Sequence, residues 1–128
     1  MVIRPLLIAA ALAALATPAL AQDAQTLTIS MSNYAFTPST LNLRAGQPYA
    51  LVFTNTVTKD HDFVAPELFA SGTIAPADQA KVVKGAVEVD DGGSVTVHFT
   101  PGKPGTYAFT CDHFMHAMLG MKGTAIVQ

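Results

Sequence analysis

The strongest constraint on the fold is an alternation of apolar and other residues with a period of two, repeated in many short stretches. Successive side chains of a β-strand point to opposite faces, so this pattern places one face of each stretch in a core. Turn sequences rich in Gly, Pro and Asp separate the stretches. The pattern predicts an all-β domain, either a β-sandwich or a β-barrel. The alternating residues are Leu27, Ile29 and Met31; Leu41 and Leu43; Tyr49, Leu51 and Phe53; Val95, Val97 and Phe99; Tyr107, Phe109 and Cys111; and Ala125 and Val127.

The first 21 residues have the features of a secretory signal peptide. Arg4 provides a positive start, Leu6 to Leu15 is an apolar run, and Ala19-Leu20-Ala21 is a small-x-small cleavage pattern. The apolar run is short for a transmembrane helix, and Pro18 breaks it near its end. We therefore expect cleavage after Ala21, export to a bacterial periplasm, no stable membrane insertion afterwards, and a mature domain of residues 22–128.

Residues 60–86 depart from the strand pattern. Pro66 and Pro76 could each begin a short helical turn, because proline is tolerated at the first helical position. The rest of this segment shows no clear period. We expect an irregular excursion between strands.

Charge and cysteine content restrict the function. From residue 22 onward, six Lys and Arg face nine Asp and Glu, a net charge of −3, which gives no support to nucleic-acid binding. The single cysteine, Cys111, has no partner for an internal disulfide in an oxidising compartment. It is therefore either a buried core residue or a metal thiolate.

The segment from Tyr107 to Gly123 concentrates soft metal ligands. Four residues separate Cys111 from His116, and four separate His116 from Met121, so a loop could bring all three side chains to one point. His61 lies far upstream and could join them only through the tertiary fold. One thiolate, two imidazoles and one thioether are the ligand set of a type 1 (blue) copper site. His113 competes with His116, and Met118 competes with Met121, for the same roles.

The chain resembles the cupredoxins, the family of plastocyanin- and azurin-like type 1 blue copper proteins. The resemblance runs through Phe36–Gly46, Val52–Asn55, His61–Phe63 and Gly105–Thr124. It implies an all-β, Greek-key β-sandwich of one domain. It also implies that His61, Cys111 and His116 form a trigonal plane around one Cu(I)/Cu(II) ion, with Met121 as a weak axial ligand. One departure is Asp62, where familiar members usually have an asparagine that braces the loop carrying the cysteine.

The ligand set and the resemblance predict an electron carrier and no enzyme, because one cysteine and one domain leave no second copper centre visible. The expected partners are periplasmic redox proteins in transient contact with a monomer, without nucleic acid. An exposed apolar surface formed by the loop around His116 would suit such brief contact. The alternative is a periplasmic copper carrier or scavenger, in which His113, His116, Met115 and Met118 offer extra sites for Cu(I).

Overall fold

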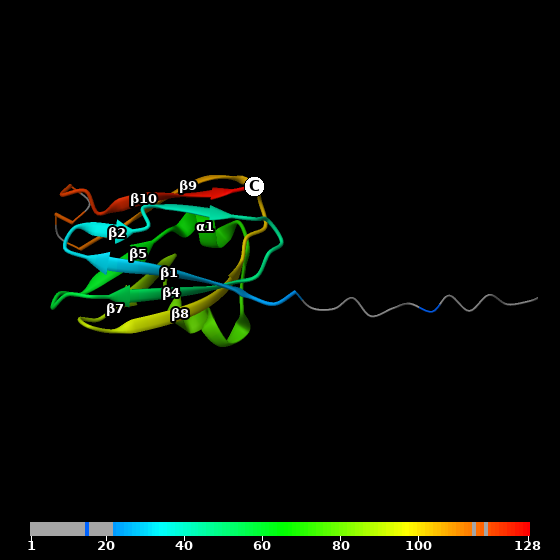
Figure 1. The fold of residues 1–128 in the computed structure, drawn as a ribbon, viewed down its shortest axis with the longest axis horizontal. Helices are drawn as coiled ribbons and strands as arrows, with labels where there is room; N and C mark the ends of the chain where they lie inside the picture. Colours follow the sequence, from blue (N-terminus) through cyan, green and yellow to red (C-terminus); the bar gives the residue numbers. More distant parts are fainter. Residues whose placement is uncertain (1–14, 16–21, 114, 117) are drawn as a thin grey trace, which may run out of the picture.

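A computed structural model describes residues 15, 22–113, 115, 116 and 118–128. Two five-stranded sheets pack face to face (Figure 1), which confirms the prediction of an all-β sandwich. The segment interpreted as a signal peptide, apart from Leu15, lies outside the described residues. In the part of the chain that is described, no helix is long and apolar enough to cross a membrane.

The first sheet has the strand order β2-β1-β4-β8-β6 and the second has the order β3-β10-β9-β5-β7. Strand β1 pairs in parallel with β4, β10 pairs in parallel with β3, and the other pairings are antiparallel. The elements are β1 (Gln25–Ser32), β2 (Ala35–Thr37), β3 (Thr40–Leu43), β4 (Tyr49–Asn55), β5 (His61–Val64), α1 (Pro66–Ala70), β6 (Thr73–Ile74), the 3₁₀ helix η1 (Pro76–Lys81), β7 (Ala86–Val89), β8 (Ser94–Thr100), β9 (Gly105–Thr110) and β10 (Lys122–Val127).

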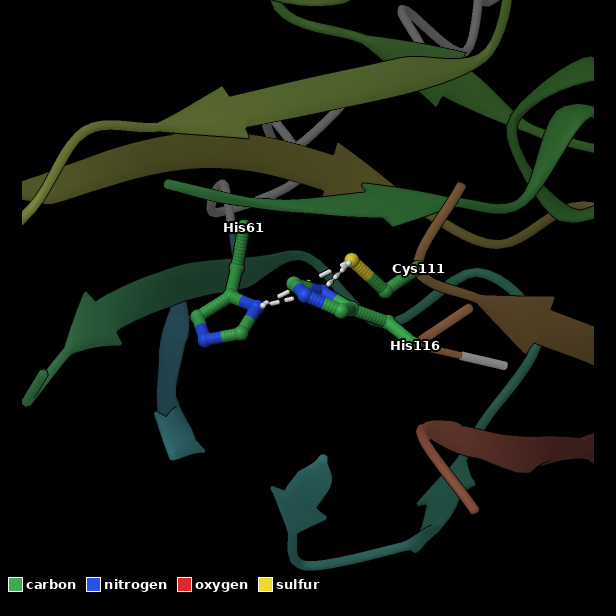
Figure 2. Close-up of side chains that lie close together, drawn as sticks. All are labelled: His61, Cys111 and His116. Carbon is green, nitrogen blue, oxygen red and sulfur yellow. Dashed lines mark hydrogen bonds between the residues drawn. The ribbon is translucent and has the colours of Figure 1, made fainter. Parts of the chain in front are cut away.

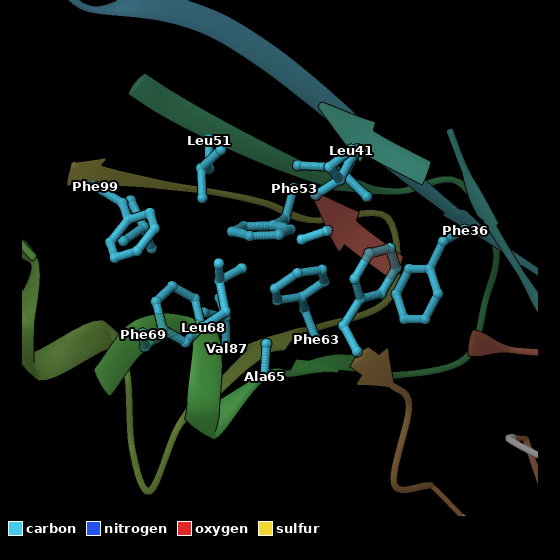
Figure 3. Close-up of a cluster of buried hydrophobic side chains, with 14 of the residues drawn as sticks. Phe36, Leu41, Leu51, Phe53, Phe63, Ala65, Leu68, Phe69, Val87 and Phe99 are labelled. Carbon is cyan, nitrogen blue, oxygen red and sulfur yellow. The ribbon is translucent and has the colours of Figure 1, made fainter. Parts of the chain in front are cut away.

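The core lies between the sheets and is rich in aromatic rings (Figure 3). Phe63 joins the rings of the two sheets, because its ring centroid lies 4.7 Å from those of both Phe53 and Phe109. Phe36 meets Phe109 edge-on at 5.2 Å, a favoured geometry for aromatic pairs. The alternating residues of the sequence supply most of this core, as the period of two predicts.

The segment 60–86 is more regular than the sequence indicates. It contains the two expected helical turns, α1 and η1, but it also contains the strands β5 and β6 and begins β7. Strand β5 has only four residues, and its two buried positions are His61 and Phe63. Because a buried histidine breaks the apolar alternation, the sequence pattern did not reveal this strand. Its position matters, because it places His61 inside the sandwich at one end.

Candidate metal centre

Three potential ligands converge at one end of the sandwich, from two segments that are far apart in the sequence. His61 is the first residue of β5, Cys111 directly follows β9, and His116 lies in the loop between β9 and β10. Figure 2 shows the two imidazole rings and the thiol pointing toward one another. All three residues are buried, and His116 has the largest exposed fraction, at 8%.

The distances between the ligand atoms suit a single metal ion. The Nδ1 atoms of His61 and His116 lie 3.2 Å apart, and Cys111 Sγ lies 3.8 Å from His61 Nδ1 and 3.3 Å from His116 Nδ1. An ion about 2.0 Å from each nitrogen and about 2.3 Å from sulfur, in the plane of all three, would give separations of about 3.5–3.7 Å. The observed separations bracket these values. The three donor atoms therefore fit one small ion with thiolate and imidazole ligands.

Burial keeps the two imidazoles neutral. It lowers the pKa of His61, with the nearby His116 as the second cause, and burial likewise lowers the pKa of His116. A neutral imidazole offers a lone pair to a metal. In a neutral ring whose Nδ1 carries the lone pair, the proton lies on Nε2, which in His61 is buried and has no hydrogen-bond partner among the described residues.

The surroundings of the Cys111 thiol act on its pKa in two directions. Burial raises its pKa to about 11, while the backbone N–H groups of Asp62 and His113 donate to its sulfur and act in the opposite direction. A buried thiolate without a cation would be costly, whereas a bound metal ion keeps sulfur deprotonated. The two backbone N–H groups therefore favour the charged form of the sulfur, and a bound cation would favour it further.

The loop between β9 and β10 is closed by backbone hydrogen bonds at Met121. The Met121 N–H donates to the carbonyl of His116 at 2.9 Å, and the Cys111 N–H donates to the carbonyl of Met121 at 3.1 Å. Gly120 turns the chain with a φ of 99°, a left-handed conformation that favours glycine. Met121 is fully buried, and its backbone is tied to both Cys111 and His116. The backbone of Met121 therefore lies beside both Cys111 and His116, as its predicted role requires.

Asp62 braces this loop as the resemblance implies for asparagine. Its Oδ1 accepts a hydrogen bond from the Asp112 N–H at 2.7 Å, which joins β5 to the residue after Cys111. Aspartate in place of asparagine therefore keeps the hydrogen-bond acceptor and adds a negative charge.

Asn55 is a supporting residue whose role the sequence did not reveal. Its side chain donates to the carbonyls of Lys59 at 2.6 Å and Val89 at 3.1 Å, and it accepts from the Val57 N–H at 3.1 Å. These three bonds hold the segment that leads into His61. An asparagine at the end of a strand, before a short loop and a histidine, was the only available signal.

The competing ligands lie elsewhere. His113 Nε2 is 2.9 Å from Glu88 Oε1, so this ring is held toward β7. Met118 is 83% exposed, in contrast to the buried Met121. Of the alternatives left open by the sequence, the structure brings His116 to His61 and Cys111, and it keeps His113 and Met118 outside this cluster.

Comparison with known proteins agrees with this geometry. The family model described as a cupredoxin-like domain matches residues 5–127. The chain belongs to the cupredoxin family. The resemblance seen in its sequence is thereby confirmed.

The solved structures that are similar to this chain include the reduced auracyanin of Roseiflexus castenholzii, with 26% identity and a TM-score of 0.62 over 82% of this chain and 98% of that one. Auracyanin A of Chloroflexus aurantiacus, described as a "blue" copper protein, has 21% identity and a TM-score of 0.60 over 83% of this chain and 100% of that one. The metal-binding domain of the Streptococcus pneumoniae Cu(I)-exporting ATPase CopA shares the fold at 17% identity, with a TM-score of 0.53 over 86% and 91% of the two chains. No curated protein sequence matches this cupredoxin.

Proposed function

We propose that this cupredoxin is a periplasmic type 1 copper protein that carries single electrons between redox partners. The observation that carries the proposal is the convergence of two neutral imidazoles and one thiol within 3.8 Å in a buried site. His61, Cys111 and His116 would be the strong ligands of the copper ion, and Met121 would be a weak fourth ligand. The bound ion would supply the one-electron chemistry by alternating between Cu(I) and Cu(II).

The chain's own residues would hold the ligands still and control access to them. Asn55 and Asp62 brace the two ligand-bearing segments, and the core behind them restricts water. His116 is the ligand that reaches an open hollow of about 480 Å³, whose lining includes Thr58, Asp60 and His113. The edge of this imidazole is the natural route for an electron, because it connects the sulfur-bearing site to the surface.

The proposal includes the expectations about location and partners. The chain would be exported, with cleavage after Ala21, and would act as a monomer in brief contact with larger redox proteins. It would not be an enzyme, since one cysteine and one domain leave no second copper centre visible.

The decisive test is the visible spectrum of the mature domain loaded with Cu(II). We expect intense absorption from charge transfer between the Cys111 thiolate and copper. Cys111→Ser should abolish this absorption while the far-ultraviolet circular dichroism remains that of a β-protein. A colourless Cu(II) complex of the unaltered protein would refute the type 1 assignment.

A copper carrier is the second candidate, because soft ligands are exposed near the site. Met118 is 83% exposed and Met115 is 45% exposed, so both thioethers could bind Cu(I). The two functions are separated by incubating the Cu(I) form with a strong Cu(I) chelator and, in parallel, by cyclic voltammetry. An electron carrier should retain its copper and cycle reversibly, whereas a carrier of copper should lose it rapidly to the chelator.

A further inference from the structure

The charges of this cupredoxin are distributed unequally between its two ends. Six of the nine carboxylates lie around the candidate metal centre, where Lys59 and Lys122 are the only two lysines, so this end has a net charge of −4. The rest of the chain from residue 22 has three carboxylates and four cationic side chains, a net charge of +1. The six carboxylates belong to Asp60, Asp62, Glu88, Asp90, Asp91 and Asp112.

Three of these residues, Asp60, Glu88 and Asp90, form what we call the acidic rim. All three are exposed, and each offers a carboxylate oxygen within 4.8 Å of those of the other two. Like charges this close repel one another. Among the described residues, no lysine or arginine forms a salt bridge with them, and the one ion-pair contact is that of Glu88 with His113. The rim therefore has negative charge that the protein itself does not neutralise.

The acidic rim adjoins the exposed edge of the metal centre. Two carboxylates, Asp60 and Asp91, and one cation, Lys59, line the same open hollow as His116, which is itself more than nine-tenths buried. His116 Nδ1 faces Cys111, and no hydrogen bond to its Nε2 is found among the described residues. An electron arriving at or leaving through His116 would therefore pass beside negative charge.

The loop that bears His116 adds an apolar contact surface. Met115, Met118 and Leu119 are 45%, 83% and 51% exposed. Exposed large apolar residues grouped beside a functional group mark an interaction surface. The candidate metal centre thus has exposed apolar contacts from its own loop and a negative charge along the edge formed by β5 and β7.

We propose that this face docks a redox partner that carries a positively charged surface around its own centre. The acidic rim would attract and orient the partner, and the apolar residues around His116 would make the close contact. Charge complementarity of this kind acts mainly on the rate of association. The inference rests on the proposed electron-transfer function, and it names the partner as a basic protein in place of a neutral or acidic one.

The first experiment measures oxidation of the Cu(I) protein by small complexes of opposite charge. Stopped-flow rates are recorded with tris(phenanthroline)cobalt(III), a cation, and with ferricyanide, an anion, from 10 to 300 mM NaCl. The cation rate should fall roughly tenfold as salt rises, because screening removes the attraction, and the anion rate should rise or stay constant. A salt dependence of the same sign for both complexes would overturn the proposal.

Two charge variants show which part of the surface causes the salt dependence of the oxidation rate. Asp60→Asn/Glu88→Gln/Asp90→Asn removes the charge of the rim, and its amide oxygen at position 60 can still accept from the Asp91 N–H. The variant should lose most of the salt dependence seen with the cation. The control Asp23→Asn/Glu67→Gln removes charge away from the site and should keep that dependence. Equal behaviour of the two variants would show that the net charge, and not this face, is responsible.

The second experiment does not depend on copper or on electron transfer. Amide resonances of the apo domain are followed by NMR during titration with pentalysine, a basic peptide that represents the charge of the partner. Shifts should cluster at residues 58–62 and 88–91 and be absent around Asp23 and Glu67. Such shifts in a protein that fails to cycle copper would refute electron transfer and leave the basic docking face standing. Shifts spread evenly, or none, would overturn the docking face alone.

Discussion

The buried carboxylate of Asp78 should control the pH dependence of stability. Asp78 lies in η1, and its side chain is only 7% exposed. One oxygen is 2.7 Å from Lys81 Nζ, and the other accepts hydrogen bonds from the backbone N–H and Nδ1–H of His98, both at 2.8 Å. These contacts join η1 to β8 and so fix the long excursion to the first sheet.

The cost of removing this carboxylate depends on its partners. Lys81 and His98 are 44% and 53% exposed, so water can solvate them when Asp78 is removed, and the ion pair itself is worth less than about 1 kcal/mol. Hydrogen bonds to a charged acceptor contribute about 1.5–3 kcal/mol. Asp78→Ala should therefore lower the free energy of unfolding by about 2–3 kcal/mol. Asp78→Asn keeps an oxygen for the His98 N–H and should cost roughly 1 kcal/mol.

The direction of the pKa shift sets the pH window. The hydrogen bond from Lys81, followed by those from His98, holds the pKa of Asp78 well below its usual range. The stabilisation is therefore complete above the ordinary aspartate pKa of about 3.9 and is lost as the pH falls below it. In this window each pH unit removes up to about 1.4 kcal/mol from the unaltered protein through this group.

The assay is urea denaturation of the apo domain at pH 7, 5, 4 and 3, with Asp23→Asn as an exposed-aspartate control. The difference in unfolding free energy between the unaltered protein and Asp78→Asn should be constant from pH 7 to 5 and shrink at pH 4 and 3. A difference that stays constant down to pH 3, or an Asp78→Ala cost within 0.5 kcal/mol of the control, would refute the reasoning.

The remaining predictions concern the metal centre. His116→Gly should open the copper to external imidazole and change the visible spectrum, whereas His113→Ala should leave the spectrum nearly unchanged, and the reverse result would show that the ligand assignment is wrong. Met121→Leu should raise the reduction potential measured by voltammetry and keep the colour, because a weak donor that favours Cu(II) is lost, while Met118→Leu should have little effect. Gly123→Ala should destabilise the apo domain by more than about 2 kcal/mol in thermal unfolding, because an added Cβ would collide with the Phe109 ring; an unchanged melting temperature would contradict this packing.

Much of the fold could be predicted from the sequence, because the alternation of apolar residues is a local property. Most positions that alternate in the sequence became the buried positions of β1, β4 and β8, with Leu27 and Val95 partly buried, and the two prolines began α1 and η1. Strand β5 was missed for a physical reason. A strand is recognised by its apolar face, and here that face begins with His61, which is buried because of the site and not because of its hydrophobicity.

For the candidate metal centre, the sequence by itself determined the kinds of ligand and the loop that carries most of them. The sequence itself contains the single cysteine, the spacing of His116 and Met121, and the family pattern. Only the tertiary structure decided how ambiguous residues are used. It brought His61 within 3.8 Å of Cys111 through the pairing of β5 with β9, and it turned His113 toward Glu88. It also gathered carboxylates from two segments, residues 60–62 and 88–90, around one end. Contacts between distant segments depend on strand order and register, which a local pattern does not encode, so the ligands could be named in advance but their neighbours could not.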